Sequence, residues 1–188
     1  MAQPVGILGG TFDPVHNAHL AVARAALHAL SLERILWLPT GAPAYRPAPV
    51  APAAHRLAML RLAFGGEPRF AIDERELAPS ASGYTYDTMK ELAQEKPRAP
   101  LVLIMGADQY AKRDSWHRWG ELQKLCRIAV VARPGAEPPD GDFTPIPMDS
   151  LDVSASEIRA RLARGADVAA LLPPPVLAYI RAHHLYGA

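Results

Sequence analysis

Residues 5–19 read Val-Gly-Ile-Leu-Gly-Gly-Thr-Phe-Asp-Pro-Val-His-Asn-Ala-His, and this stretch decides the fold. Its first four residues form a continuous apolar run, which is typical of a strand buried on both faces of a sheet. The run ends at Gly9-Gly10, which indicates a tight turn. From Asn17 to Leu30 apolar residues recur every three or four positions, so we expect a helix with Asn17 as its N-cap. A buried strand, a glycine turn and a helix together form the first unit of an α/β fold.

The rest of the chain continues this alternation of apolar runs and amphipathic segments. It predicts a Rossmann-like, doubly wound parallel sheet with helices on both faces, in a single domain over residues 1–188. A small helical region, about residues 151–188, is expected at its C-terminal end. Further strands are expected over Arg34–Leu38, Arg69–Asp73, Leu101–Met105 and Arg127–Ala132, and helices over Ala53–Phe64, Asp87–Gln94, Asp108–Leu125, Ser154–Leu162 and Pro174–His183.

Composition excludes several classes of protein. The 188 residues include 20 Lys and Arg against 19 Asp and Glu, so no broad positive surface is expected for nucleic acid or a membrane. The single cysteine, Cys126, excludes an internal disulfide, and its apolar neighbours indicate a buried core position. No signal-peptide pattern and no membrane-spanning apolar run are found in the sequence, so we expect a cytoplasmic protein.

The chemistry of residues 9–19 points to phosphate. Two glycines let a ligand approach the backbone closely, and the N–H groups of the following helix start are unpaired donors for phosphate oxygens. His16 and His19 are three residues apart, so both rings can face one side of that helix. Such donors can stabilise the charge that builds up on a reacting phosphorus centre. The spacing is neither the G-x-G-x-x-G dinucleotide fingerprint nor a Walker A loop.

These residues carry a resemblance to a known superfamily. The turn from Gly9 to His16, followed by His19, resembles the nucleotidyltransferases whose signature is T/S-x-x-H-x-G-H. Over its full length the chain is similar to the bacterial nicotinate-nucleotide adenylyltransferases. The further segments that agree with that family are Asp73–Leu77, Gly83–Thr85, Met105–Gln109 with Trp116, Val153–Arg159 and Leu171–Ile180.

The resemblance implies transfer of AMP from ATP to nicotinate mononucleotide, which gives nicotinate adenine dinucleotide and pyrophosphate in NAD biosynthesis. The 5′-phosphate would attack the α-phosphorus in line, without a covalent enzyme intermediate. Mg²⁺ would accompany ATP, held by substrate phosphates and water rather than by a dedicated set of protein ligands.

The resemblance also implies roles for individual residues. His16, His19 and Arg159 would be catalytic, with the histidines stabilising the transition state and Arg159 the leaving pyrophosphate. The residues implied in binding ATP are Gly9, Gly10, Thr11, Phe12, Gly106, Asp108, Arg133, Ser156 and Ile158, and those implied in binding nicotinate mononucleotide are Arg46, Tyr84, Thr85, Trp116 and His117.

Three positions depart from the family pattern. Ala18 replaces the glycine between the two histidines, and Ala155 replaces a serine of the late motif. The usual P-P-H-[K/R] loop reads Pro-Ala-Tyr-Arg over residues 43–46, which keeps the cation but not the histidine. Two segments also have simpler interpretations: Ser154 with Glu157 as a capping box, and residues 73–76 as a solvated strand end.

Other functions remain open on the sequence alone. The acceptor of AMP could be the amide mononucleotide, because a single contact can decide between acid and amide. A pantetheine phosphate is a weaker alternative, because the transferases that use it are shorter and lack the segments of Tyr84-Thr85 and Trp116. A nucleotide-binding module that has lost catalysis would keep the same fold. A nicotinamide-dependent oxidoreductase is disfavoured, since the dinucleotide fingerprint is missing. The sequence does not decide between a monomer and a homo-oligomer.

Overall fold

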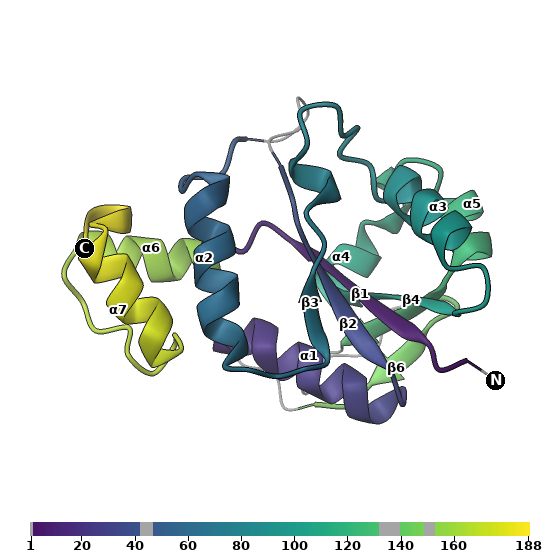
Figure 1. Ribbon diagram of the computed structural model, residues 1–188, viewed down its shortest axis with the longest axis horizontal. Coiled ribbons are helices and arrows are strands. Elements are labelled where there is room, and N and C mark those ends of the chain that lie inside the picture. The colour runs from purple at the N-terminus through teal and green to yellow at the C-terminus, as the bar shows by residue number, and fades with distance from the viewer. Residues whose placement is uncertain (1, 42–46, 132–139, 149–152) are drawn as a thin grey trace.

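A six-stranded parallel sheet forms the centre of the chain in the computed structural model (Figure 1). The structure describes residues 2–41, 47–131, 140–148 and 153–188. Strand order is β3-β2-β1-β4-β5-β6, and each neighbouring pair is parallel. This confirms the predicted Rossmann-like, doubly wound α/β fold.

Among the described residues, no helix is both long and apolar enough to cross a membrane.

Most elements lie close to the predicted ranges. The strands are β1 (Val5–Gly10), β2 (Arg34–Pro39), β3 (Phe70–Ile72), β4 (Leu101–Gly106), β5 (Arg127–Val131) and β6 (Thr144–Ile146). The helices are α1 (Asn17–Ala29), α2 (Ala53–Phe64), α3 (Thr85–Glu95), α4 (Ala107–Ala111), α5 (Trp119–Leu125), α6 (Ala155–Ala163) and α7 (Pro174–Ala182), with 3₁₀ turns η1 (Arg75–Leu77), η2 (Arg113–Ser115) and η3 (Leu185–Gly187).

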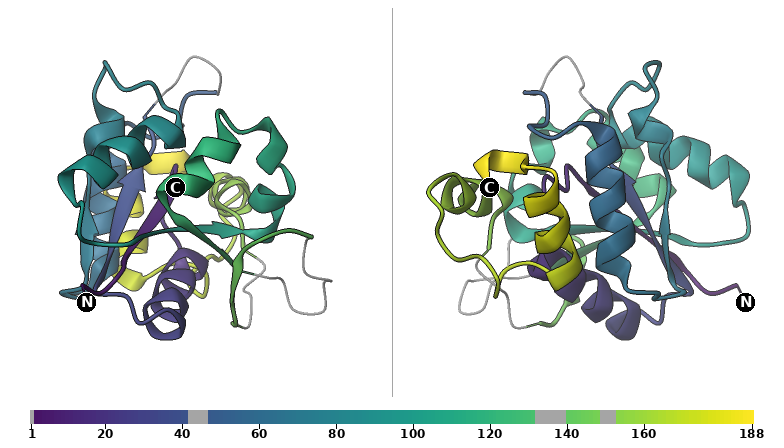
Figure 2. Two further views of the ribbon diagram at one scale, coloured as in Figure 1. Left: turned by 90° about the vertical axis from the view of Figure 1, so that its right-hand side faces the viewer. Right: turned by 60° about the vertical axis from the view of Figure 1, so that its left-hand side comes forward.

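Helices cover both faces of the sheet. Neighbouring residues in a strand point to opposite faces, so Leu8 and Ile7 of β1 belong to different hydrophobic clusters. The cluster around Leu8 includes buried side chains of α1, α2, α6 and α7, and the cluster around Ile7 includes those of α3 and α5. Figure 2 shows α7 alongside α2, and the two helices are in contact. The C-terminal helices therefore complete one face of the core.

The topology places a ligand site at one end of the sheet. The chain runs outward from β1 through β2 to β3, and then returns to β4 on the other side of β1. In such sheets the crevice outside the carboxyl ends of the two strands at this reversal is the usual ligand site. Gly9 and Gly10 end β1 and Gly106 ends β4, so both strands finish in glycine at that crevice.

The single helix predicted over residues 108–125 is wrong, because the structure has α4, η2 and α5 in its place. Arg118 adopts a left-handed conformation with φ 55°, which interrupts the helix before α5. Tyr110 and Leu122 are both buried, although they would lie about 120° apart around one continuous helix. The break allows both side chains to pack against the sheet.

The sequence analysis also missed β6, a strand of three residues at the edge of the sheet. Pro145 stands in its middle, and proline lacks the N–H that a central strand would need. Only one side of an edge strand is paired, so proline is tolerated there. Ile146 is nevertheless buried in the core, as its apolar character requires.

Candidate active site

A cavity of about 740 Å³ opens at the carboxyl ends of β1 and β4. Many parts of the chain line it, among them the turn after β1 with the start of α1, the loop before α2, the turn η1, the start of α3, the start of α4 and the start of α6. The residues singled out from the sequence that line this cavity are Gly9, Gly10, Thr11, Phe12, His16, His19, Thr85, Gly106, Asp108, Trp116, Ser156 and Arg159. Residues from both ends of the sequence therefore meet at one site.

Gly9 and Gly10 of the turn have different structural surroundings. A Cβ at Gly9 would meet no atom of the described chain within 4 Å, so this backbone faces open cavity. A Cβ at Gly10 would lie 2.9 Å from the ring of Phe12, which is closer than carbon atoms approach. Phe12 itself has φ 49° and is buried against Trp37, with 5.2 Å between ring centroids. The turn thus presents bare backbone on one side and a fixed aromatic ring on the other.

The two histidines stack at the start of α1. Their ring centroids are 3.7 Å apart and their planes differ by 25°. The backbone N–H of His16 donates to Nδ1 of His19 at 3.3 Å, and Phe12 packs its edge against His19 at 5.0 Å. The predicted N-cap was wrong by one residue, because His16 is extended and Asn17 already belongs to the helix. The Asn17 amide instead donates to the Ala170 carbonyl at 3.0 Å.

Burial keeps this histidine pair neutral. Burial lowers the pKa of His16 to about 4. Burial also lowers the pKa of His19 well below its ordinary value, and charge repulsion from His16 lowers it further. Since Nδ1 of His19 accepts a hydrogen bond, the proton of the neutral ring is assigned to Nε2. Within the described part of the chain, the buried Nδ1 of His16 has no hydrogen-bond partner.

These pKa values predict that the protein loses stability as the pH falls from 6.5 to 4. An unfolded histidine binds a proton near pH 6.5, but His16 in the folded protein does so only near pH 4. Between these values the unfolded state binds more protons, so the free energy of unfolding falls as the pH is lowered. We expect His16→Gln to reduce this slope, by up to about 1 kcal/mol per pH unit.

Urea denaturation at several pH values measures this slope. The control is His28→Gln, because His28 is exposed on the same helix. In His28→Gln, the slope of the free energy of unfolding against pH should equal that of the wild type. Equal slopes for His16→Gln and the wild type would contradict the lowered pKa of His16.

Arg159 reaches the first turn from α6. Its Nη1 donates to the main-chain carbonyl of Asp13 at 2.6 Å and lies 4.0 Å from the Asp13 carboxylate. Ser154 caps α6 and accepts a hydrogen bond from the Glu157 N–H at 3.2 Å, as predicted. The Glu157 side chain pairs with Arg161 instead of closing a capping box. Arg159 and Ser156 thus line the same cavity as the histidine pair, and Arg159 contacts the turn that carries the pair.

A buried network holds this end of the cavity together, and the sequence analysis missed it. The Asp13 carboxylate accepts hydrogen bonds from the N–H groups of Val50 (2.6 Å) and Ala51 (3.1 Å) and from the Tyr186 hydroxyl (2.7 Å). Arg56 donates to the carbonyls of the turn and of the loop before α2, which are Thr11 at 2.8 Å, Thr40 at 2.9 Å and Ala51 at 3.2 Å.

One signal in the sequence pointed to Arg56. It occupies the same face of α2 as Met59, Leu60 and Ala63, at helical spacing. A charged residue on an otherwise apolar face is buried only with partners. Asp13 gave no such signal, because its partners lie 37, 38 and 173 residues away along the chain.

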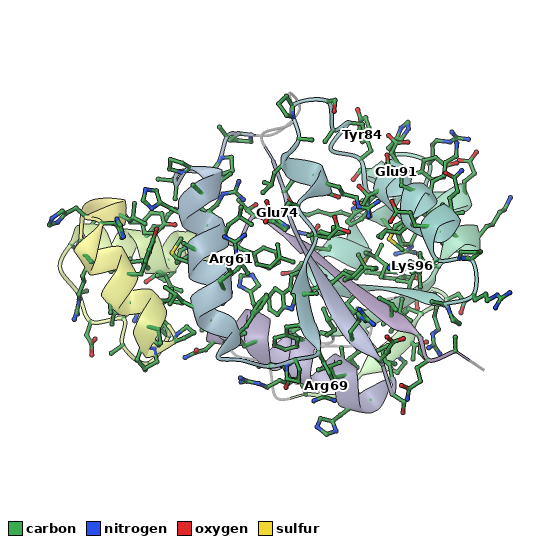
Figure 3. All side chains as sticks on the ribbon, in the orientation of Figure 1. Arg61, Arg69, Glu74, Tyr84, Glu91 and Lys96 are labelled. Atoms are coloured by element: carbon green, nitrogen blue, oxygen red, sulfur yellow. The ribbon has the colours of Figure 1, made fainter. Side chains whose placement is uncertain are left out.

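The predicted residues for the pyridine substrate are divided between the cavity and its surroundings. Thr85 and Trp116 line the cavity. The rings of Tyr84 and His117 are in contact beside it, with centroids 4.4 Å apart and planes tilted by 30°, and Figure 3 shows Tyr84 on the loop before α3. Arg46 and the ATP-site residue Arg133 lie outside the described residues.

Ile158, which the resemblance implied in ATP binding, lies in the core. Its side chain is buried among the apolar residues below α6, and its N–H donates to the Ser154 carbonyl at 3.1 Å. Any contact of Ile158 with a nucleotide would therefore be indirect.

The solvated strand end predicted for residues 73–76 is wrong for Glu76. This residue is only 8% exposed, accepts a hydrogen bond from Oγ1 of Thr88 at 2.8 Å and lines the cavity. The turn η1 directs its side chain inward, while Arg75 turns outward to a cluster of carboxylates that includes Asp73 at 2.9 Å. Periodicity could not separate these neighbours, since a 3₁₀ turn of three residues is too short to show a pattern.

Two comparisons with protein sequences describe what the chain is similar to. The cytidylyltransferase-like family model matches residues 7–161. A probable nicotinate-nucleotide adenylyltransferase from Laribacter hongkongensis is 42% identical, with 97% of this chain and 94% of that protein covered. A probable nicotinate-nucleotide adenylyltransferase from Chromobacterium violaceum is 41% identical, with 99% of this chain and 100% of that protein covered.

Solved structures share the fold. The Plasmodium falciparum nicotinic acid mononucleotide adenylyltransferase complexed with NaAD superposes with a TM-score of 0.85 over 98% of this chain and 97% of that chain. The same parasite enzyme complexed with APC gives a TM-score of 0.83 over the same shares. Sequence identity is 20% in both cases, so these likenesses support the architecture alone.

Proposed function

The chain belongs to the nicotinate-nucleotide adenylyltransferase family of nucleotidyltransferases, and we propose that it transfers the AMP part of ATP to nicotinate mononucleotide in NAD biosynthesis. The products are nicotinate adenine dinucleotide and pyrophosphate. The observation that carries the proposal is the stacked pair of His16 and His19 in one cavity with Arg159.

ATP binds with its phosphates at the histidine end of the cavity. The exposed backbone at Gly9 and the N-terminal end of α6 at Ser156 both offer polar groups to phosphate oxygens there. Arg159 adds a fixed positive charge, because its guanidinium is held by Asp13. His16 and His19 supply neutral N–H donors that are already in place before reaction, so little reorganisation accompanies charge build-up on the α-phosphate.

The reaction proceeds by direct displacement. The 5′-phosphate of the mononucleotide attacks the α-phosphorus in line, a P–O bond forms, and the bond to pyrophosphate breaks. The attacking oxygen is already anionic, so no general base is required. Catalysis is therefore chiefly positioning and charge stabilisation, and no covalent enzyme intermediate is formed.

Mg²⁺ accompanies ATP in this proposal. Among the residues that the structure describes, no group of three or more His, Cys, Asp or Glu side chains could hold a metal ion. At the phosphate end, Arg159 has no lone pair for a metal ion, and the Nδ1 lone pair of His19 already accepts the His16 N–H. The cation would thus be held by phosphate oxygens and water, where it neutralises charge.

The mononucleotide occupies the other end of the cavity. Trp116 offers an aromatic face for stacking on the pyridine ring, and Thr85 lies at the start of α3 in the same wall. Tyr84 and the backbone near His117, whose rings are in contact beside the cavity, approach the carboxylate. We assign the nucleotide phosphate to Arg46, and the ATP ribose and adenine to Asp108 and Arg133.

The identity of the acceptor predicts a preference for acid over amide. We expect kcat/KM for nicotinate mononucleotide to exceed that for nicotinamide mononucleotide by at least about tenfold, because a polar site built for one group leaves unpaired partners with another. Steady-state pyrophosphate release with each mononucleotide at fixed ATP measures the ratio. Equal values would contradict the acid assignment but would leave adenylyl transfer itself standing.

A further inference from the structure

The last residues of the chain contact the first turn. Tyr186 lies in η3, two residues before the C-terminus, and its hydroxyl donates to Oδ1 of Asp13 at 2.7 Å. The two residues are 173 positions apart in the sequence. The Asp13 carboxylate is buried, so this hydrogen bond is shielded from water, and together with the N–H groups of Val50 and Ala51 it fixes the direction of the carboxylate.

The backbone at the chain end is strained in a way that serves this contact. Tyr186 has φ 60° and ψ 20°, and His184 has φ 48°, both in the left-handed region that bulky residues rarely adopt. Such conformations persist only where surrounding structure fixes them, and they gather at functional sites. The next residue, Gly187, packs closely on α6, since a Cβ there would lie only 3.3 Å from Cα of Ala163.

Asp13 joins this chain end to Arg159. The Asp13 main-chain carbonyl accepts from Nη1 of Arg159 at 2.6 Å, and Oδ2 of the Asp13 carboxylate, whose Oδ1 binds Tyr186, lies 4.0 Å from the same nitrogen. Tyr186 does not line the cavity, whereas Arg159 does. The order of contacts is therefore hydroxyl, carboxylate and then guanidinium. Asp13 also lines the cavity, but its carboxylate repels phosphate, so the Arg159 guanidinium is the group of the three that can bind one.

We propose that Tyr186 is a positioning residue, which holds Asp13 so that Asp13 fixes the Arg159 guanidinium at the phosphate end of the cavity. The inference rests on the proposed function in one respect, namely that Arg159 binds the β- and γ-phosphates of ATP. The last residues of the chain would thus support the phosphate site. The hydroxyl of Tyr186 controls the affinity for the β- and γ-phosphates, and the binding of the adenosine part of ATP does not depend on it.

Binding measurements on Tyr186→Phe test this role without depending on turnover. This change removes the hydroxyl and keeps the ring. Calorimetric titration compares two probes, adenosine 5′-(α,β-methylene)triphosphate and AMP, of which only the first has outer phosphates. We expect the dissociation constant of the triphosphate to rise roughly tenfold, the loss expected from one hydrogen bond to a charged group, and that of AMP to stay unchanged.

Tyr179→Phe is a matched control. Tyr179 of α7 also bonds the C-terminal region to the rest of the molecule, since its hydroxyl lies 2.9 Å from Nδ1 of His55 in α2. This contact includes neither Asp13 nor Arg159, so the variant should lose a similar amount of thermal stability while binding both probes like the wild type. An unchanged triphosphate affinity in Tyr186→Phe, or an equal loss for AMP and triphosphate, would overturn the proposal.

A double variant checks that the effect passes through Arg159. In an Arg159→Ala background, Tyr186→Phe should weaken triphosphate binding by less than twofold, because the group that it positions is gone. A further tenfold loss would contradict the proposed route. If the wild-type chain binds the triphosphate but never forms dinucleotide, the proposed function is refuted. The binding measurements on Tyr186→Phe then still test the role of Tyr186. A wild-type chain that does not bind the triphosphate would refute the inference.

Discussion

Replacing His19 by alanine is expected to lower kcat by about 100- to 1000-fold, the usual loss for one transition-state donor. His19 is fixed by the His16 N–H at 3.3 Å, by ring stacking at 3.7 Å and by the edge of Phe12. Burial holds it neutral, so its Nε2–H can donate to phosphate oxygens throughout the physiological pH range. Steady-state pyrophosphate release measures the loss, and KM for ATP should change much less than kcat.

His28→Ala is the control for this prediction. His28 lies in the last turn of the same helix and is exposed, so its removal should leave kcat within a factor of two of the wild type. Thermal unfolding of His19→Ala should confirm that the variant is folded. Turnover retained at the wild-type rate in a folded His19→Ala protein would contradict the role given to this residue.

Replacing Arg56 by leucine is expected to lower the free energy of unfolding by about 3–5 kcal/mol. Only 2% of Arg56 is exposed, and its guanidinium donates to the carbonyls of Thr11, Thr40 and Ala51. Leucine would leave these buried acceptors unpaired. It would also remove a positive charge that acts on the buried Asp13 carboxylate. Urea denaturation followed by circular dichroism measures the change.

Arg61→Leu is the matched control, since Arg61 lies on the same helix but is exposed. Its pair with Glu74, at 2.9 Å, stands on the surface, where such pairs contribute less than about 1 kcal/mol. Figure 3 labels both residues. Arg56→Lys keeps the positive charge but lacks the forked donors of the guanidinium. Its free energy of unfolding should lie between those of Arg56→Leu and Arg61→Leu. An Arg56→Leu protein as stable as Arg61→Leu would contradict the importance of the network.

The fold was predictable from the sequence because its strands are continuous apolar runs. Val5–Leu8 and Leu101–Met105 can be nothing but buried strands in a chain where helical segments separate them. Parallel strands bring their carboxyl ends to one edge, so the convergence of Gly9 and Gly106 followed directly. The break in the helix at Arg118 could not be predicted from the sequence, because it depends on the tertiary packing of Tyr110 and Leu122.

The hydrogen-bond network around Asp13 could not be predicted from the sequence. Motif residues such as His16 and His19 are local, three positions apart, and so their pairing could be predicted. Asp13 is surrounded by groups from α2, its preceding loop and the chain end, and no periodicity relates residues that far apart. Tyr186 owes its place to a left-handed backbone, which sequence patterns for a tyrosine do not predict.

The measurement that tests the proposed reaction most directly is the product balance of the purified full chain with ATP, Mg²⁺ and nicotinate mononucleotide. Chromatography of nucleotides and an enzymatic pyrophosphate assay follow both products in the same sample. The proposed reaction predicts one nicotinate adenine dinucleotide and one pyrophosphate for each ATP consumed. Absence of pyrophosphate with every pyridine mononucleotide, in a protein that still binds ATP, would contradict adenylyl transfer and indicate a nucleotide-binding module.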